Sequence, residues 1–112
     1  PYTMEFNAPN CLSKLASIAE AAGVNRMGES QENNAFYAVK GVRKLMEDVN
    51  FPISLKDIGI KEEDIEIMAT RMLKVTRLLA HNPRELTIED AINLFQRMHE
   101  GKPMPLSEYI KS

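Results

Sequence analysis

The chain has 112 residues, of which 44% are hydrophobic and 27% are charged, with 14 basic against 16 acidic side chains. This length and composition are typical of one globular domain, so we expect a single domain over residues 1–112. A formal net charge of −2 gives no basic footprint for nucleic acid or an anionic membrane, and no apolar run reaches the roughly 20 residues that span a bilayer.

The single cysteine, Cys11, excludes an internal disulfide. The chain has neither an N-x-S/T sequon nor a basic segment followed by an apolar one, which would signal secretion. We therefore expect a reducing compartment and predict a cytoplasmic protein. The chain opens on an apolar stretch from Pro1 to Phe6 without an initiator methionine, and we interpret it as a fragment of a longer chain.

Helical periodicity dominates the sequence and predicts an all-α fold, a small helical bundle. The first helix is expected at residues 10–22, with Pro9 at its start and Gly23 as a left-handed stop. The second is expected at residues 31–49, with Ser30 as its N-cap. Gly41 interrupts the apolar stripe of this second helix, and a glycine there indicates a close approach by another helix.

Residues 51–60 are compatible with two local structures. Phe51, Ile53 and Leu55 alternate with other residues, which could indicate a short strand. Ser54 and Asp57 have the spacing of a capping box, and Gly59 follows within one turn (sequence S-L-K-D-I-G). We favour a buried apolar loop that contains one helical turn.

Residues 62–80 predict a third helix, which is apolar beyond one stripe and has three acidic residues in its first turn. Because such a helix is buried on more than one side, we predict that it is central and that the other helices pack around it. A fourth helix is expected at residues 88–100, with a capping box at Thr87 and a stop at Gly101. The proline-broken tail, residues 101–112, is expected to form at most one loose turn.

Few side chains could carry chemistry. His81 and His99 lie in no metal-binding spacing. His99 is expected in the last turn of a helix, where a cation suits the dipole, and His81 after a helix end, bonded to a free carbonyl or to solvent. Cys11 lies in a first helical turn, where the dipole can lower a thiol pKa, but we favour a role as a small buried hydrophobe.

Other features have structural explanations too. Met68 and Met72 are spaced i, i+4 and could form an adaptable binding surface, but we interpret them as core filling. The acidic run at residues 62–64 could hold a cation, but a helix start explains it. Phosphate-binding glycine loops, G-x-S-x-G and C-x-x-C are absent from the sequence. We therefore predict no catalytic, cofactor-binding or metal-binding residue in this chain.

Four segments in order resemble the iron-containing (group III) alcohol dehydrogenases. They are P-Y-T-M-E-F-N-A-P at residues 1–9, F-P-I-S-L-K-D-I-G-I at 51–60, E-D-I at 63–65 and N-P-R-E-L-T-I-E-D at 82–90. The spacing between these four motif segments also fits the family. The resemblance covers about residues 1–100 and leaves 101–112 as an extra tail.

The resemblance implies that the chain is the C-terminal part of the helical domain of such an enzyme. The family has an α/β domain for the nicotinamide cofactor and a helical domain that holds a divalent metal, iron or zinc, through one Asp and three His. Those ligands precede the M-E-F-N segment, so this chain is expected to hold none of them, and His81 is not a ligand. At a position near the cleft where many members carry a cysteine, the register places Leu78.

Two functions follow as hypotheses. In the first, the chain supplies packing and one wall of the cleft to a metal-dependent, NAD(P)-linked alcohol dehydrogenase. The whole enzyme would transfer a hydride from an alcohol carbon to the nicotinamide, with the metal as Lewis acid, and the chain alone would be inactive. In the second, the chain is a free-standing helical protein-interaction module without catalytic activity.

The expected partners are the rest of the parent enzyme and a second copy of the chain. Without upstream helices, we expect Tyr2, Met4, Phe6 and part of residues 62–80 to lack cover. Because a small domain rarely exposes several large apolar side chains together, a symmetric homodimer is predicted. The N-terminal segment could be exchanged, or paired as a strand, across that interface.

Overall fold

The computed structural model describes residues 1–109, apart from the side chain of Leu78. Over this range the chain forms α-helices and short 3-10 turns without a strand, which confirms the all-α prediction and removes the strand alternative at residues 51–55. The α-helices are α1 (Tyr2–Asn7), α2 (Leu12–Ala21), α3 (Gln31–Asp48), α4 (Ile65–Leu73), α5 (Thr76–Leu79), α6 (Ile88–Glu100) and α7 (Leu106–Tyr109). The 3-10 turns are η1 (Ala8–Asn10), η2 (Lys56–Ile58) and η3 (Glu62–Asp64). No described helix is long and apolar enough to cross a membrane.

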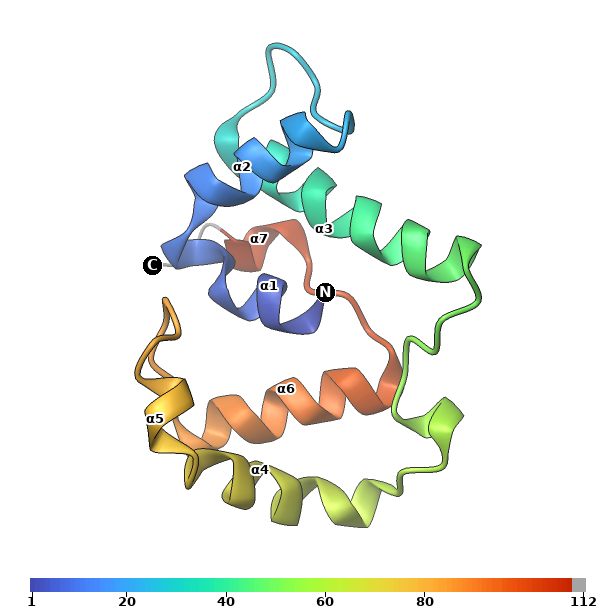
Figure 1. Cartoon of the computed structure of the whole chain (residues 1–112), viewed down its shortest axis with the longest axis vertical. Coiled ribbons are helices and arrows are strands. Elements are labelled where there is room, and N and C mark those ends of the chain that lie inside the picture. Colours follow the sequence, from blue (N-terminus) through green and yellow to red (C-terminus); the bar gives the residue numbers. More distant parts are fainter. Residues whose placement is uncertain (110–112) are drawn as a thin grey trace.

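The helices form two pairs with a thin layer between them. Helices α2 and α3 pack together on one side, α4 and α6 on the other, and α1 and α7 lie between the pairs (Figure 1). The radius of gyration is 14.6 Å, compared with about 13 Å for a compact domain of this length. The fold is therefore more open than a close-packed bundle, and its middle layer determines how the two pairs fit together.

Helix α1 forms most of that middle layer because it has two apolar sides. Side chains spaced i, i+4 share a helix face, so Tyr2 and Phe6 lie on one side, and Met4 lies on the other with Ala8, the first residue of η1. The first side belongs to a cluster with Leu94 of α6. The second side packs in a cluster that α2, α3 and α7 share. The expectation that the N-terminal segment lacks cover is therefore wrong for Tyr2 and Phe6, which are buried within their own chain, whereas Met4 is half-buried.

The predicted helix ends are largely confirmed, because they depend on local chemistry. The hydroxyl of Ser30 accepts a hydrogen bond from the Asn33 amide at 3.1 Å. A reciprocal capping box between Thr87 and Asp90 starts α6. Gly101 ends α6 in the left-handed region at φ 75°. Cap residues therefore identify helix ends in this chain without information on the tertiary structure.

Gly41 allows a close approach, as predicted, but its neighbour is not a helix. A Cβ atom at this position would lie 3.4 Å from Cγ1 of Val24, which follows the end of α2. The side chain of Val24 therefore packs against the surface of α3 at this glycine.

Residues 51–60 form the expected loop with one helical turn, η2. The Asp57 amide donates to the Ser54 hydroxyl at 3.1 Å, and the Leu55 amide donates to the Met98 carbonyl of α6 at 2.8 Å. The loop is less buried than predicted, since Phe51 is 61% exposed and Ile58 is 56% exposed. The loop is attached to α6 through this backbone bond and through Ile53, which packs in the same cluster as Leu94.

The prediction of one central helix over residues 62–80 is wrong in two respects. The segment divides into η3, α4 and α5, because 3-10-type bonds from Lys74 to Arg71 and from Val75 to Met72 tighten the end of α4. The helix is interrupted at Lys74 and Val75 and resumes as α5 at Thr76, and the β-branched Val75 has a lower helix propensity. The segment is also peripheral: α4 packs mainly on α6, and its buried residues are Ile65 and Ala69.

The tail after Gly101 is better packed than expected. Met104 is 6% exposed and Tyr109, in the single turn of α7, is 1% exposed. The predicted loose turn at residues 107–112 corresponds in part to α7, and residues 110–112 lie outside the described part of the chain. The tail thus contributes side chains to the same cluster as α1, α2 and α3.

Candidate functional site

Three of the four motif segments meet at α1. The Asn7 and Asn82 side chains exchange two amide hydrogen bonds of 2.8 Å. The Arg84 guanidinium donates to the Phe6 carbonyl at 2.8 Å and lies 4.3 Å from the centre of the Phe6 ring. The Tyr2 hydroxyl donates to the carbonyl of Ile53 at 2.6 Å. Segments 1–9, 51–60 and 82–90 are thus joined by polar contacts between residues far apart in the sequence.

A buried carboxylate, Glu5, lies at the centre of this junction. Glu5 is 1% exposed. Its Oε1 accepts from Nη2 of Arg43 at 2.6 Å and from Nη2 of Arg97 at 2.9 Å. Its Oε2 accepts from the Met104 amide at 2.5 Å. We call these four residues the Glu5 cluster; they connect α1, α3, α6 and the tail.

The electrostatics of the Glu5 cluster favour the charged form of Arg43. A carboxylate buried without partners is strongly disfavoured, but two guanidinium groups and a backbone N–H surround this one. Burial lowers the pKa of Arg43, whereas the hydrogen bond and charge of Glu5 raise it, and the net effect is a raised pKa. The Arg43 guanidinium also lies 4.6 Å from the centre of the Tyr2 ring. The cluster therefore holds the middle layer together through charge as well as packing.

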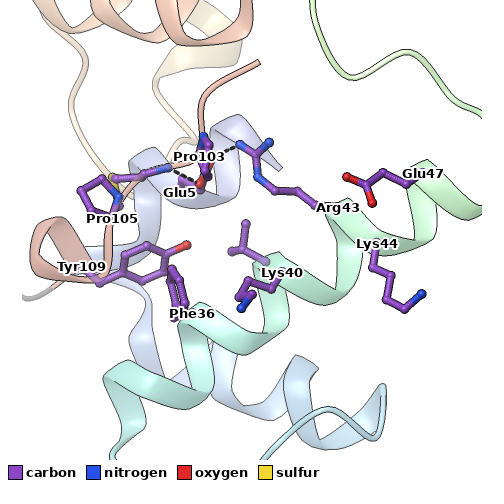
Figure 2. A pocket seen from close by; sticks show the side chains of 11 residues that line it. Glu5, Phe36, Lys40, Arg43, Lys44, Glu47, Pro103, Pro105 and Tyr109 are labelled. Carbon is purple, nitrogen blue, oxygen red and sulfur yellow. Dashed lines mark hydrogen bonds and ion pairs between the residues drawn. The ribbon is translucent and has the colours of Figure 1, made fainter. Parts of the chain in front are cut away.

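A pocket of about 730 Å³ adjoins the Glu5 cluster, between α3 and the tail (Figure 2). Its apolar walls come from Phe36, Val39, Pro103, Met104, Pro105 and Tyr109. Its charged lining residues are Glu5, Lys40, Arg43, Lys44 and Glu47. Its size lies within the range of small-molecule sites, about 300–1,000 Å³.

Two buried polar atoms beside this pocket have no hydrogen-bond partner, the Tyr109 hydroxyl and Nε of Arg43. The Tyr109 ring packs edge-on against Phe36 at 5.6 Å between centroids, and its hydroxyl points toward α3 (Figure 2). Burial, followed by the nearby charge of Glu5, raises the pKa of Tyr109, so the hydroxyl stays protonated at neutral pH. It is therefore available as a hydrogen-bond donor.

The two histidines lie in different surroundings. His99 lies in the last turn of α6, as predicted, and its Nε2 is 3.0 Å from the carbonyl oxygen of Ile60. His81 is exposed and follows α5, in agreement with the interpretation that it faces solvent. In the described residues, 1–109, no three His, Cys, Asp or Glu side chains gather closely enough to hold a metal ion.

Cys11 behaves as a small apolar residue rather than as a nucleophile. It is the N-cap of α2, and it is partly buried against the cluster that contains Leu15. Its thiol donates to the Asn7 carbonyl at 3.1 Å. Burial raises the pKa of Cys11, against a smaller lowering by the charge of Lys14. The preferred sequence interpretation agrees with this geometry.

The remaining predicted features lie at the periphery. Met68 and Met72 of α4 are half-buried, so they fill space at the edge of the fold rather than in the core. The acidic run Glu62–Asp64 forms η3 and is exposed. Leu78 lies in α5, and its side chain is outside the described part of the structure. Among the described side chains, Met68, Met72 and the acidic run do not line the pocket.

Sequence reasoning missed the Glu5 cluster and Tyr109. One signal was present, because Glu5 is the single charged residue within the otherwise uncharged stretch 1–9. A charge inside a buried segment requires partners of opposite sign, which could have directed attention to the arginines of the apolar helices. Arg43 and Arg97 are 38 and 92 residues away from Glu5, so no local pattern links them to it.

Comparisons with known proteins agree with the motif segments. Residues 1–99 match the Fe-containing alcohol dehydrogenase family, C-terminal. Lactaldehyde reductase of Escherichia coli strain K12 is 37% identical over 95 residues, which cover 85% of this chain and 25% of that enzyme. 1,3-Propanediol dehydrogenase of Citrobacter freundii is 31% identical over 97 residues, covering 87% of this chain and 25% of that enzyme.

A solved structure has the same fold over this region. Alcohol dehydrogenase from Oenococcus oeni superposes with a TM-score of 0.82 at 37% identity, over 88% of this chain and 26% of that protein. The chain thus spans about a quarter of the length of the relatives it matches. With the family match over residues 1–99, these findings show that the chain belongs to the iron-containing alcohol dehydrogenase family and corresponds to its C-terminal helical region.

Proposed function

We propose that this chain is the C-terminal helical portion of an NAD(P)-linked, metal-dependent alcohol dehydrogenase. The observation that carries the proposal is the shared fold at 37% identity with a solved alcohol dehydrogenase. The reaction of the whole enzyme would transfer a hydride between an alcohol carbon and a nicotinamide. Relatives named for lactaldehyde, 1,3-propanediol and methanol support a short-chain alcohol or aldehyde as substrate.

In this proposal the chain's own residues support the enzyme rather than react. The described residues do not fit a metal site, because no suitable group of side chains gathers among them. We therefore assign the iron or zinc, and the NAD(P), to other parts of the whole enzyme and derive no chemical step through them. The contribution of this chain would be packing and one wall of the cleft, held in shape by α1 and the Glu5 cluster.

The isolated chain of 112 residues is proposed to be inactive. Calorimetric titration with NAD⁺, NADP⁺, Zn²⁺ and Fe²⁺ (the last under anaerobic conditions) is expected to show no stoichiometric binding. Tight one-to-one binding of either metal would contradict the proposal and would return attention to His81 and His99.

A chimera tests the function directly. Residues 1–99 of this chain would replace the matching C-terminal segment of the E. coli lactaldehyde reductase. We expect the purified chimera to reduce lactaldehyde with NADH or NADPH. The matched control is the same chimera with Arg84→Ala, which would lose the contact to Phe6 and is expected to be less active. A folded, metal-loaded chimera without activity would contradict the proposal.

We also propose that residues 1–112 form one helical domain of a longer cytoplasmic protein that associates as a homodimer. Exposed apolar side chains support the association: Leu45, Val49, Phe51, Ile58, Ile67 and Val75. Exposed apolar side chains of this kind would also serve the alternative, a protein-interaction module without activity. Analytical ultracentrifugation of the chain from micromolar to millimolar concentration is expected to show a dimer. A monomer at every concentration in that range would contradict this part of the proposal.

A further inference from the structure

The pocket between α3 and the tail differs in kind from the rest of the middle layer. Elsewhere in that layer polar side chains bond to one another, as the Asn7 and Asn82 amides do. At the pocket, the buried Tyr109 hydroxyl and Nε of Arg43 have no partner. A buried donor without an acceptor is unfavourable, because it has lost its hydrogen bonds to water and gained none in the protein. Two such donors beside one pocket can be satisfied by a ligand that carries hydrogen-bond acceptors.

The charge of the pocket favours an anionic acceptor. Three cations, Lys40, Arg43 and Lys44, line it together with two carboxylates, Glu5 and Glu47. Arg43 is paired with Glu5, and Lys44 is paired with Asp48 at 3.3 Å on the exposed side of α3. Among the described residues, Lys40 is therefore the lining cation without a carboxylate partner. The Glu5 carboxylate is already bonded to two guanidinium groups and a backbone amide, so it offers little repulsion to a second anion. The Tyr109 hydroxyl is protonated and can donate.

The body of such a ligand must be apolar. Phe36, Val39, Met104 and Pro105 form the walls, and the edge-to-face pair of Phe36 and Tyr109 presents aromatic surface to the pocket. A volume of about 730 Å³ admits a molecule of two or more rings or a medium-length chain.

We infer that this pocket binds a small organic carboxylate with an apolar body, whose carboxylate accepts a hydrogen bond from the Tyr109 hydroxyl (Figure 2). Lys40 and Lys44 attract the carboxylate from the rim of the pocket. Binding of this carboxylate requires no step of the alcohol dehydrogenase reaction, so the inference does not depend on the proposed function.

The test uses 2-naphthoate and its neutral isostere 2-naphthamide on the 112-residue chain. Isothermal titration calorimetry is expected to show saturable one-to-one binding of 2-naphthoate and binding of 2-naphthamide that is several-fold weaker. Amide resonances of residues 36–44, 104 and 106–109 are expected to shift on titration. No saturation at millimolar 2-naphthoate, equal binding of the two probes, or shifts confined to other regions would overturn the inference.

Tyr109→Phe removes the donor and keeps the ring. We expect it to weaken 2-naphthoate binding about tenfold and to leave 2-naphthamide binding less affected. The matched control is Tyr37→Phe, on α3 but outside the pocket lining, which is expected to bind as the unchanged chain does. Equal binding by Tyr109→Phe and the unchanged chain would overturn the inference.

A second variant keeps the test decisive if Tyr109→Phe does not fold. Lys40 and Lys44 are exposed, so Lys40→Gln with Lys44→Gln should leave the fold intact. The double variant is expected to weaken 2-naphthoate binding several-fold without changing 2-naphthamide binding. Lys14→Gln with Lys74→Gln is the control for overall charge. Unchanged 2-naphthoate binding in the first pair, or an equal loss in both pairs, would overturn the inference.

Discussion

Helix α1 and helix α4 are both rich in apolar residues, yet they occupy opposite positions in the fold. Four of the six residues of α1 are buried, Tyr2, Glu5, Phe6 and Asn7. In the nine residues of α4, the buried ones are Ile65 and Ala69, and Ile67 is 53% exposed. The shorter helix is thus the central one, and the longer helix covers one side of α6.

Their polar contacts explain the difference. The residues of α1 bond to partners on α3, α6, the tail and the segment before α6. In α4, the Thr70 hydroxyl donates to the Glu66 carbonyl of its own helix at 2.8 Å. Burial of a helix in a small fold depends on how many other elements reach it. Apolar content alone therefore does not identify the central helix.

The largest contrast is expected from removing apolar side chains in the two helices. Phe6 is 7% exposed, and Phe6→Ala should lower the free energy of unfolding by about 3–5 kcal/mol, since it leaves a cavity in the middle layer. Ile67→Ala in α4 should cost about 1 kcal/mol or less, because the side chain is half in water. Urea denaturation followed by circular dichroism measures both, and an equal cost would remove the distinction between the helices.

The Glu5 cluster is the next most sensitive feature. Glu5→Gln keeps the shape of the side chain but leaves two guanidinium groups without their carboxylate. We expect the free energy of unfolding to fall by about 3 kcal/mol, as is usual when one partner of a buried ion pair is removed. Glu66→Gln on the exposed side of α4 is the control and should stay within about 0.5 kcal/mol of the unchanged chain. A Glu5→Gln variant as stable as its control would show that the cluster does not hold the layer together.

A smaller effect is expected where the amides of α1 meet the segment before α6. Asn82→Ala leaves the Asn7 side chain without its two amide bonds and should cost about 1–2 kcal/mol. The neighbouring His81→Ala should have an effect within about 0.5 kcal/mol, since His81 is exposed. Thermal unfolding of the two variants side by side provides the measurement, and equal melting temperatures would contradict the importance of this contact.

The smallest expected effect concerns the pH dependence of stability at Tyr109. Its folded pKa is raised above the unfolded value of 10.0, so above pH 10 the unfolded state loses a proton that the folded state keeps. Stability should therefore fall as the pH rises above 10, by up to about 1.4 kcal/mol per pH unit. Tyr109→Phe should remove this part of the slope in urea titrations at pH 9 to 11. Identical slopes for the two proteins would contradict the burial of the hydroxyl.

These contrasts also show which features a sequence can predict. The starts of α3 and α6 follow from Ser30 and Thr87, and the end of α6 follows from Gly101, because each signal acts within a few residues. The family follows from the motif segments, which the comparisons support. The position of α1 does not follow, because its burial depends on Arg97 and other residues far along the chain. The pocket could not be predicted for the same reason. The tail forms one of its walls, and its sequence carries no local signal for packing against α3.

Hydrogen exchange of the native 112-residue chain tests the central position of α1 most directly. The account predicts that the bonded amides of residues 5–8 exchange among the slowest in the molecule, together with those of α6, although they lie near the chain start. The amides of residues 69–72 in α4 should exchange faster, through local opening of a peripheral helix. Slow exchange in α4 combined with fast exchange at residues 5–8 would contradict the account.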